Sequence, residues 1–246
     1  MITPQQQRTA DLVHSQGFAI VNLRNSHGFA LEDAWIVLVD DWNHLELDKH
    51  MADGGEYRRR RVGRYFWSPT TRELIRLPHA AVYQSRDING FAGGIERHFA
   101  PLRDSTFNNP WLLHTICEDF LIFQSSKEGR ALDTWEVCVH QIRIATIGDR
   151  EAPPTPEGIH RDGHDFVAMH LIGRTNVLGG ESLIYDNFGK RLHTKLLETA
   201  LDTIYADDRR VAHGTEPIRT ILQDQLATRD MLIIDYDHRP ELVRPA

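Results

Sequence analysis

The second half of the chain, from about residue 134, consists of short runs in which β-branched and other apolar residues alternate with polar ones. Turn residues separate these runs, and no helical pattern lies between most of them. The runs are TWEVCVHQIRIAT, DFVAMHLIG, ESLIYD, LDTIYADDRRVAHG and RDMLIIDYD. Short strands in this arrangement predict a sandwich or jelly roll, so we expect an α+β, mainly β fold with this core.

Helical patterns precede the strands. Near the amino terminus, Thr3 and Gln6 form a capping box, Pro4 occupies the first turn and Gly17 supplies a stop. A second helix is expected over about 31–46, and a third begins within NNPWLLHTICEDFLIF, where an asparagine cap precedes a first-turn proline. The expected buried stripes are Trp35, Leu38, Val39, Trp42 and Leu45 in the second helix, and Leu113, Ile116, Phe120 and Phe123 in the third.

The length of 246 residues suits one domain over 1–246, because sandwiches and barrels of this size often do not split. We expect a helical part over about 1–55 and the jelly-roll core over about 56–246. No apolar run approaches the roughly 18 residues that a membrane span requires. The start MITPQQQRTA lacks the pattern of a signal peptide, and the chain has two cysteines, which fits a reducing cytoplasm. A net charge of -7 argues against general nucleic-acid binding.

Four consecutive arginines stand in the segment EYRRRRVGRYFW. On a strand, Arg58 and Arg60 would point to one face and Arg59 and Arg61 to the other. One pair can therefore face inward. The sequence leaves open whether the run is a solvated edge or holds a buried guanidinium that binds a carboxylate, and RNA binding is a third alternative.

Two histidines are followed two residues later by an acidic residue, the number that chance gives for this composition. His44 and Glu46 fall in the second predicted helix, where residues two apart point away from each other. His160 and Asp162 precede an apolar run, and on a strand their Cα atoms would lie roughly 6.5 to 7 Å apart on one face. This spacing lets both side chains reach one metal ion, whereas His164, roughly 13 Å from His160 on such a strand, is expected to be a neighbour.

A metal site needs a third donor, and His213, late in an apolar strand, offers one. Two histidines and one carboxylate with open positions suit mononuclear non-haem iron(II). A 2-oxo acid can fill two of these positions and dioxygen the third. An arginine would then bind the far carboxylate of the 2-oxo acid, with Arg229 as the first choice and Arg219 as the second. As a strand-end residue, Arg229 is nearly as well explained by facing solvent.

The segments GIHRDGHDFVAMHLIGRTNVLGGESLIYD, LDTIYADDRRVAHGTEPI and RDMLIIDYD together resemble a bacterial family of iron(II)/2-oxoglutarate dioxygenases that hydroxylate free L-amino acids. This family includes the L-isoleucine 4-hydroxylases and proteins linked to biofilm behaviour. The segments RRRRVGRYFW, GGIERHF and VCVHQIRIA extend the resemblance over most of the chain from about residue 56.

The resemblance implies a double-stranded β-helix, a cupin-like jelly roll, with His160, Asp162 and His213 as catalytic iron ligands and Arg229 as the anchor of 2-oxoglutarate. It implies Fe(II), 2-oxoglutarate and O2 as cofactor and cosubstrates, with ascorbate as a candidate reductant. An aspartate at 162 disfavours the halogenase variant of this chemistry. The resemblance does not match substrate contacts residue by residue. The candidates are Arg58, Arg60, Tyr65, His140, Gln141 and Arg143, which supply a cation for a carboxylate more clearly than an acceptor for an ammonium.

The implied activity is hydroxylation of a small substrate, such as a free L-amino acid, with release of succinate and CO2. Two alternatives stay open: a cupin-like hydrolase or isomerase that uses zinc or manganese, and a jelly-roll binding module without catalysis. Dependence on 2-oxoglutarate would distinguish a dioxygenase from the first alternative. An exposed Arg229 with no cavity beside His160 would favour the second. The sequence does not fix the oligomeric state.

Overall fold

The computed structural model describes residues 2–24, 31–87, 90–91, 93–124 and 133–245. Residues 1 and 246, the bounds of the single domain expected from the sequence, lie outside these ranges. None of the helices in the described ranges is both long enough and apolar enough to cross a membrane.

Local capping sets both ends of the first helix and the start of the last one in the described ranges. Helix α1 (Pro4–Gln16) has the predicted capping box, in which the Thr3 hydroxyl accepts from the Gln6 N–H, and it ends at Gly17, whose φ of 89° is left-handed. The predicted second helix is wrong in its extent: it forms α2 (Glu32–Asp40) and a 3-10 turn, η2 (Asp41–His44). After α3 (Asp104–Phe107) comes α4 (Pro110–Gln124), for which Asn109 Oδ1 accepts N–H bonds from the first turn, as predicted.

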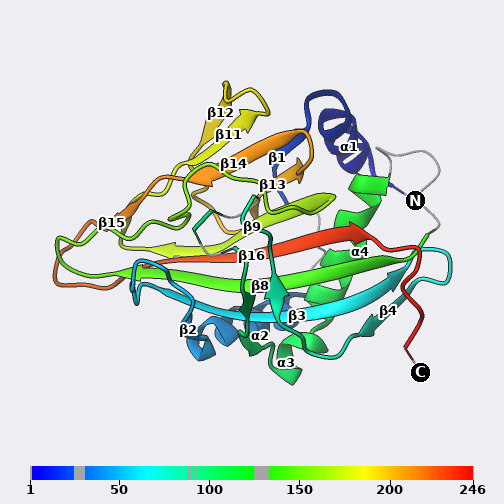
Figure 1. The fold of residues 1–246 in the computed structure, drawn as a ribbon, viewed down its shortest axis with the longest axis horizontal. Helices are drawn as coiled ribbons and strands as arrows, with labels where there is room; N and C mark the ends of the chain where they lie inside the picture. Colours follow the sequence, from blue (N-terminus) through cyan, green and yellow to red (C-terminus); the bar gives the residue numbers. More distant parts are fainter. Residues whose placement is uncertain (1, 25–30, 88–89, 92, 125–132, 246) are drawn as a thin grey trace.

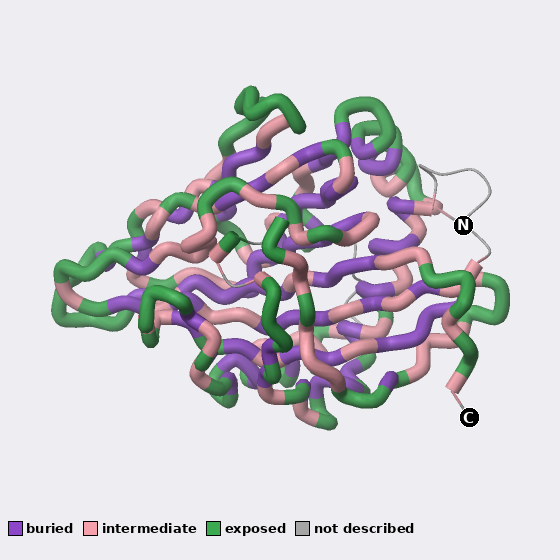
Figure 2. The backbone as a smooth tube through the Cα atoms, in the orientation of Figure 1, coloured by how far each residue is buried: buried purple, intermediate pink, exposed green. Residues whose placement is uncertain are grey.

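A nine-stranded sheet forms the centre of the fold (Figure 1). Its order is β1 (Phe18–Asn22), β13 (Asp202–Asp207), β9 (Phe166–Thr175), β16 (Ala227–His238), β8 (Trp135–Thr146), β3 (Arg58–Ser68) and β2 (Glu46–Leu47), and both β4 (Glu73–Arg76) and β7 (Ala100–Pro101) pair with β3. These pairings are antiparallel except that of β3 with β7. Figure 2 shows that burial is concentrated on the long central strands.

Smaller sheets complete the jelly roll. A three-stranded sheet has the order β12 (Arg191–Lys195), β11 (Ser182–Asp186) and β14 (Val211–Thr215). Two-stranded pairs are formed by β10 (Val177–Gly179) with β15 (Ile218–Thr220), and by β5 (Val82–Tyr83) with β6 (Glu96–Arg97). In Figure 1 the β11, β12 and β14 strands lie on the side of the main sheet opposite α2 and α3.

The two faces of the main sheet carry different residues because side chains alternate along each strand. On β16, Leu232, Ile234 and Tyr236 pack with residues of α1, α2 and α4 in the largest apolar cluster. Met231 packs with Ile184 and other residues on the side of the three-stranded sheet. The main sheet is therefore covered on one face by helices and on the other by the smaller sheets.

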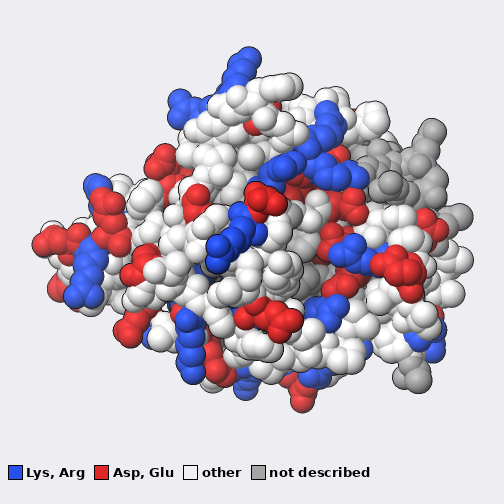
Figure 3. All heavy atoms as spheres, viewed as in Figure 1, with Lys and Arg blue, Asp and Glu red and all other residues white. Residues whose placement is uncertain are grey.

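The arginine run follows the predicted alternation. Arg58 and Arg60 on β3 are buried, whereas Arg59 is exposed and Arg61 pairs with Glu46. A single strand predicted over LDTIYADDRRVAHG is wrong, since a turn divides it into β13 and β14. The surface in Figure 3 carries interspersed basic and acidic side chains and no continuous basic area on the face shown.

Asp119 ties helix α4 to the sheet. It is fully buried, and it accepts hydrogen bonds from Tyr205 Oη (2.6 Å) and His170 Nε2 (2.9 Å), which lie on β13 and β9. A carboxylate at this depth is tolerated because both of its oxygens have donors.

Asp119→Ala should lower the free energy of unfolding by about 3 kcal/mol, because it leaves two buried donors without an acceptor. Urea denaturation followed by circular dichroism measures this change. Asp104→Ala, which removes the exposed ion pair with Arg76, is the matched control and should have little effect. Equal losses in the two variants would contradict a structural role for Asp119.

Candidate active site

Three potential metal donors converge beside β14 of the three-stranded sheet. Asp162 Oδ1 lies 3.4 Å from His160 Nε2, and Asp162 Oδ2 lies 3.3 Å from His213 Nε2. The two imidazole centroids are 4.7 Å apart, and all the donor atoms lie within 4.8 Å of one another. This arrangement can hold one metal ion with two histidines and one carboxylate, leaving other coordination positions free.

The local structure of this group differs from the strand that the sequence predicted. His160 and Asp162 both precede β9, which begins at Phe166, so the prediction that they lie within a strand is wrong. His160 instead forms an isolated bridge with His213, in which each backbone N–H donates to the other carbonyl, at 2.9 and 2.8 Å. This bridge brings the two histidines together although 53 positions separate them in the chain.

Hydrogen bonds fix the orientation of the donors. The imidazole Nδ1 of His160 lies 3.0 Å from the carbonyl of Gly158, to which it can donate, and this leaves Nε2 free to face Asp162. Asp208, which is 1% exposed, accepts backbone N–H bonds from Asp162 (3.1 Å), Gly163 (2.7 Å) and His164 (3.1 Å). The Asp208 carboxylate thus holds the irregular segment that carries Asp162.

The close approach of these groups shifts their ionisation. Burial opposes the charged form of His160, but the hydrogen bond and charge of Asp162 outweigh it and raise the pKa of His160 to about 9. Burial also opposes ionisation of Asp162, yet the two neighbouring histidines hold its pKa well below the usual value. The carboxylate is therefore charged at neutral pH, as a metal ligand must be.

A cavity opens beside the three donors, between the main sheet and the smaller sheets. Its lining includes four of the residues that the sequence singled out besides the donors: Arg58, Arg60, His140 and Arg229. His164, expected to be a neighbour, also lines it, with Nδ1 2.8 Å from Asp237 Oδ2.

Four other sequence candidates lie elsewhere. Tyr65 is in the apolar core under the helices, where its hydroxyl donates to Phe107 O. Gln141 is buried and does not line the cavity, and Arg143 pairs with Asp230. Arg219 is exposed and pairs with Glu151. Gln141 and Arg143 both lie on β8, where side chains alternate between the two faces, so they point away from the cavity that neighbouring His140 lines.

Arg229 is 3% exposed and lines the cavity. Its Nε atom has no hydrogen-bond partner, and no carboxylate in the described ranges forms an ion pair with it. Burial and the charge of Arg174 lower the pKa of Arg229 to about 10, so the guanidinium stays protonated at neutral pH. Gly180, with a φ of 81°, lies against it, since a Cβ there would be 3.4 Å from Arg229 Cδ.

Sequence reasoning missed Arg97 and Asp235, which also line the cavity. The sequence could have indicated Asp235, because it lies an even number of positions from Arg229 on the same strand and therefore on the same face. Nine buried side-chain nitrogen and oxygen atoms in the described ranges lack a hydrogen-bond partner. Six of them belong to cavity-lining residues: Arg60, Arg97, Glu157, His213, Arg229 and Asp235. Because buried polar groups in proteins are usually satisfied, this concentration marks a place for ligands.

The chain is similar in sequence to known proteins. A family model described as 2OG-Fe dioxygenase matches residues 39–235. The L-isoleucine-4-hydroxylase of Bacillus thuringiensis is 25% identical over 91% of this chain and 97% of its own length. The 3(1)-hydroxy-L-isoleucine 4-dioxygenase of Pantoea ananatis is 23% identical over 64% of each protein.

Solved structures support the fold. A bsmA homolog from Methylobium petroleophilum PM1 is 30% identical and superimposes with a TM-score of 0.83, covering 94% of this chain and 92% of the other. The crystal structure of IDO from Bacillus thuringiensis, 20% identical, gives a TM-score of 0.81 over 95% and 99% of the two chains. The predicted jelly roll and the family resemblance are confirmed. The chain belongs to the 2OG-Fe dioxygenase family, oxidoreductases that use Fe(II), 2-oxoglutarate and O2.

Proposed function

We propose that this protein hydroxylates a free L-amino acid with an aliphatic side chain while it converts 2-oxoglutarate and O2 to succinate and CO2. One oxygen atom enters the hydroxyl group and the other enters succinate. The observation that carries the proposal is a buried, unpaired guanidinium, that of Arg229, in the same cavity as a two-histidine, one-carboxylate donor set. The substrate class is suggested by two relatives, an L-isoleucine-4-hydroxylase and a 3(1)-hydroxy-L-isoleucine 4-dioxygenase.

His160, Asp162 and His213 would hold the iron. The donor set fits, because both imidazole Nε2 atoms and the carboxylate face one another in a partly enclosed site. When bound, Fe(II) brings 2-oxoglutarate and O2 together and supplies the oxidant for an unactivated C–H bond.

Arg229 would bind the carboxylate of 2-oxoglutarate that is distant from the metal. A planar guanidinium binds a carboxylate through two parallel hydrogen bonds, and burial strengthens this pairing. Apolar side chains on the cavity wall, Ile142, Ile144, Met169, Met231 and Ile233, suit an aliphatic substrate and limit access of water.

Asp208→Ala should weaken metal binding by about 10- to 100-fold, because it frees the segment that carries Asp162. Titration with Co(II), followed by its visible absorption, measures this affinity. Asp202→Ala is the control, since Asp202 also accepts backbone N–H bonds, from Glu198 and Thr199, but lies outside the cavity lining. A Co(II) affinity lowered as much by Asp202→Ala would show that general destabilisation is responsible.

The direct test is succinate release from 2-oxoglutarate by Fe(II)-loaded protein in air, screened against the twenty L-amino acids, with ascorbate as reductant. We expect at least one aliphatic amino acid to stimulate release, and His160→Ala to abolish it. Turnover of a substrate without 2-oxoglutarate would support a hydrolase or isomerase instead. Absence of stimulation by every amino acid would refute the proposed substrate class.

Arg229→Gln should raise the KM for 2-oxoglutarate by about 100-fold, because it removes the buried charge that the distal carboxylate needs. Arg219→Gln should leave this KM unchanged, since Arg219 is exposed and pairs with Glu151. Initial rates at varied 2-oxoglutarate concentration provide both values. A larger effect in the Arg219 variant would reverse the assignment.

A further inference from the structure

Beside Arg229, the cavity contains a second buried arginine without a carboxylate partner. Arg97 on β6 is 4% exposed; its Nη2 donates to Gln84 Oε1 (2.5 Å) and its Nε has no partner. No carboxylate in the described ranges forms an ion pair with Arg97, whereas Arg58 and Arg60 share Asp48. The Gln84 amide also donates to the backbone carbonyl of Asp162 (2.8 Å), so Arg97 is one side chain away from the metal donors.

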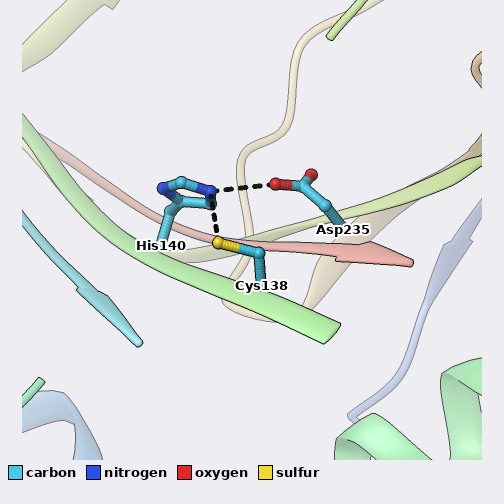
Figure 4. Close-up of side chains that lie close together, drawn as sticks. All are labelled: Cys138, His140 and Asp235. Atoms are coloured by element: carbon cyan, nitrogen blue, oxygen red, sulfur yellow. Dashed lines mark hydrogen bonds and ion pairs between the residues drawn. The ribbon is translucent and has the colours of Figure 1, made fainter. Parts of the chain in front are cut away.

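A buried carboxylate on β16, that of Asp235, is incompletely paired. Asp235 is 3% exposed, and its Oδ2 accepts from His140 Nε2 (2.9 Å) and lies 3.6 Å from His164 Nε2. Its other oxygen, Oδ1, is buried without a hydrogen-bond partner. Figure 4 shows this second oxygen pointing away from His140.

Cys138, His140 and Asp235 are close enough to suggest a second metal site (Figure 4). The hydrogen bonds of His140 argue against it. Arg60 Nη2 lies 2.6 Å from His140 Nδ1, and because a guanidinium only donates, Nδ1 is the acceptor and the proton is on Nε2. That proton is donated to Asp235, so neither ring nitrogen is free for a metal. The two hydrogen bonds, from Arg60 to His140 and from His140 to Asp235, instead fix the Asp235 carboxylate in one orientation.

We propose that Arg97 and Asp235 bind the two charged ends of the amino-acid head group, with Arg97 pairing with the α-carboxylate and Asp235 Oδ1 accepting from the α-ammonium. This inference rests on the proposed function. The two guanidinium groups without a carboxylate partner would then bind the distal carboxylate of 2-oxoglutarate and the substrate carboxylate, and Asp235 Oδ1 would accept from the ammonium. The other unpartnered carboxylate oxygen of the lining, Oε2 of Glu157, belongs to a side chain that lies beside the metal donor His160, with Oε1 3.5 Å from its Nε2. Asp235 supplies the ammonium acceptor that the candidates named from the sequence offered less clearly than the cation.

The test compares three ligands of Fe(II)- and 2-oxoglutarate-loaded protein. They are the amino acid most active in the succinate screen, the acid that lacks its amino group and the amine that lacks its carboxylate. For L-isoleucine these analogues are 3-methylpentanoate and 2-methylbutylamine, which are measured as competitive inhibitors. Asp235→Asn should raise the KM of the amino acid by about 100-fold. It should also raise the inhibition constant of the amine, but not that of the acid. Arg97→Gln should raise the KM of the amino acid and the inhibition constant of the acid, but not the inhibition constant of the amine.

The matched controls are Asp202→Asn, on β13 and outside the cavity lining, and Arg59→Gln, exposed on β3. Both should retain the wild-type KM. If Asp235→Asn or Arg97→Gln weakened binding of all three ligands equally, the residue would act only on structure, and the inference would be wrong. Unchanged KM values in the two variants would also overturn it. If no amino acid stimulated succinate release by the wild-type protein, the proposed function itself would be refuted, and the head-group inference with it.

Discussion

The pleat of the long strands β3, β8 and β16 is the constraint on which the rest of the structure depends. Alternate side chains point to opposite faces, so each strand contributes both to the helix-covered core and to the cavity wall. On β16, Ile234 and Tyr236 pack against the helices while Arg229 and Asp235 face the cavity. A shift of one residue in register would exchange the two sets, so the packing that stabilises the sheet also places the site.

The cavity wall concentrates charges that the protein itself does not neutralise. Buried charged groups that are incompletely paired destabilise a folded protein. Arg97, Arg229 and Asp235 are such groups, because each has a buried polar atom without a hydrogen-bond partner. The helix-side core, where Asp119 has a donor for each oxygen, stabilises the sheet that carries them. This division is expected of an enzyme, because a site complementary to charged ligands is not also optimal for stability.

Local chemistry explains which sequence predictions succeeded. The caps of α1 and α4 depend on residues a few positions apart, and the alternation of the arginine run depends only on strand geometry. The placement of His160 and Asp162 on a strand was wrong, yet the two side chains converge because the bridge to His213 and the bonds to Asp208 replace strand geometry. Tyr65, Gln141 and Arg143 were misplaced because the sequence does not reveal which strand face is covered by helices.

By itself, the sequence determined the mainly β fold, the family resemblance and the choice of His160, Asp162 and His213 as candidate metal donors, since these follow from residue types and their order along the chain. Only the tertiary structure decided that Arg229 and not Arg219 is buried in the cavity, and that Arg97 and Asp235 face the same space. Both arginines near the strand ends look alike in sequence. Their burial, and the meeting of residues on β6 and β16, are set by sheet register and by how the smaller sheets cover the larger one, which involves contacts between distant parts of the chain.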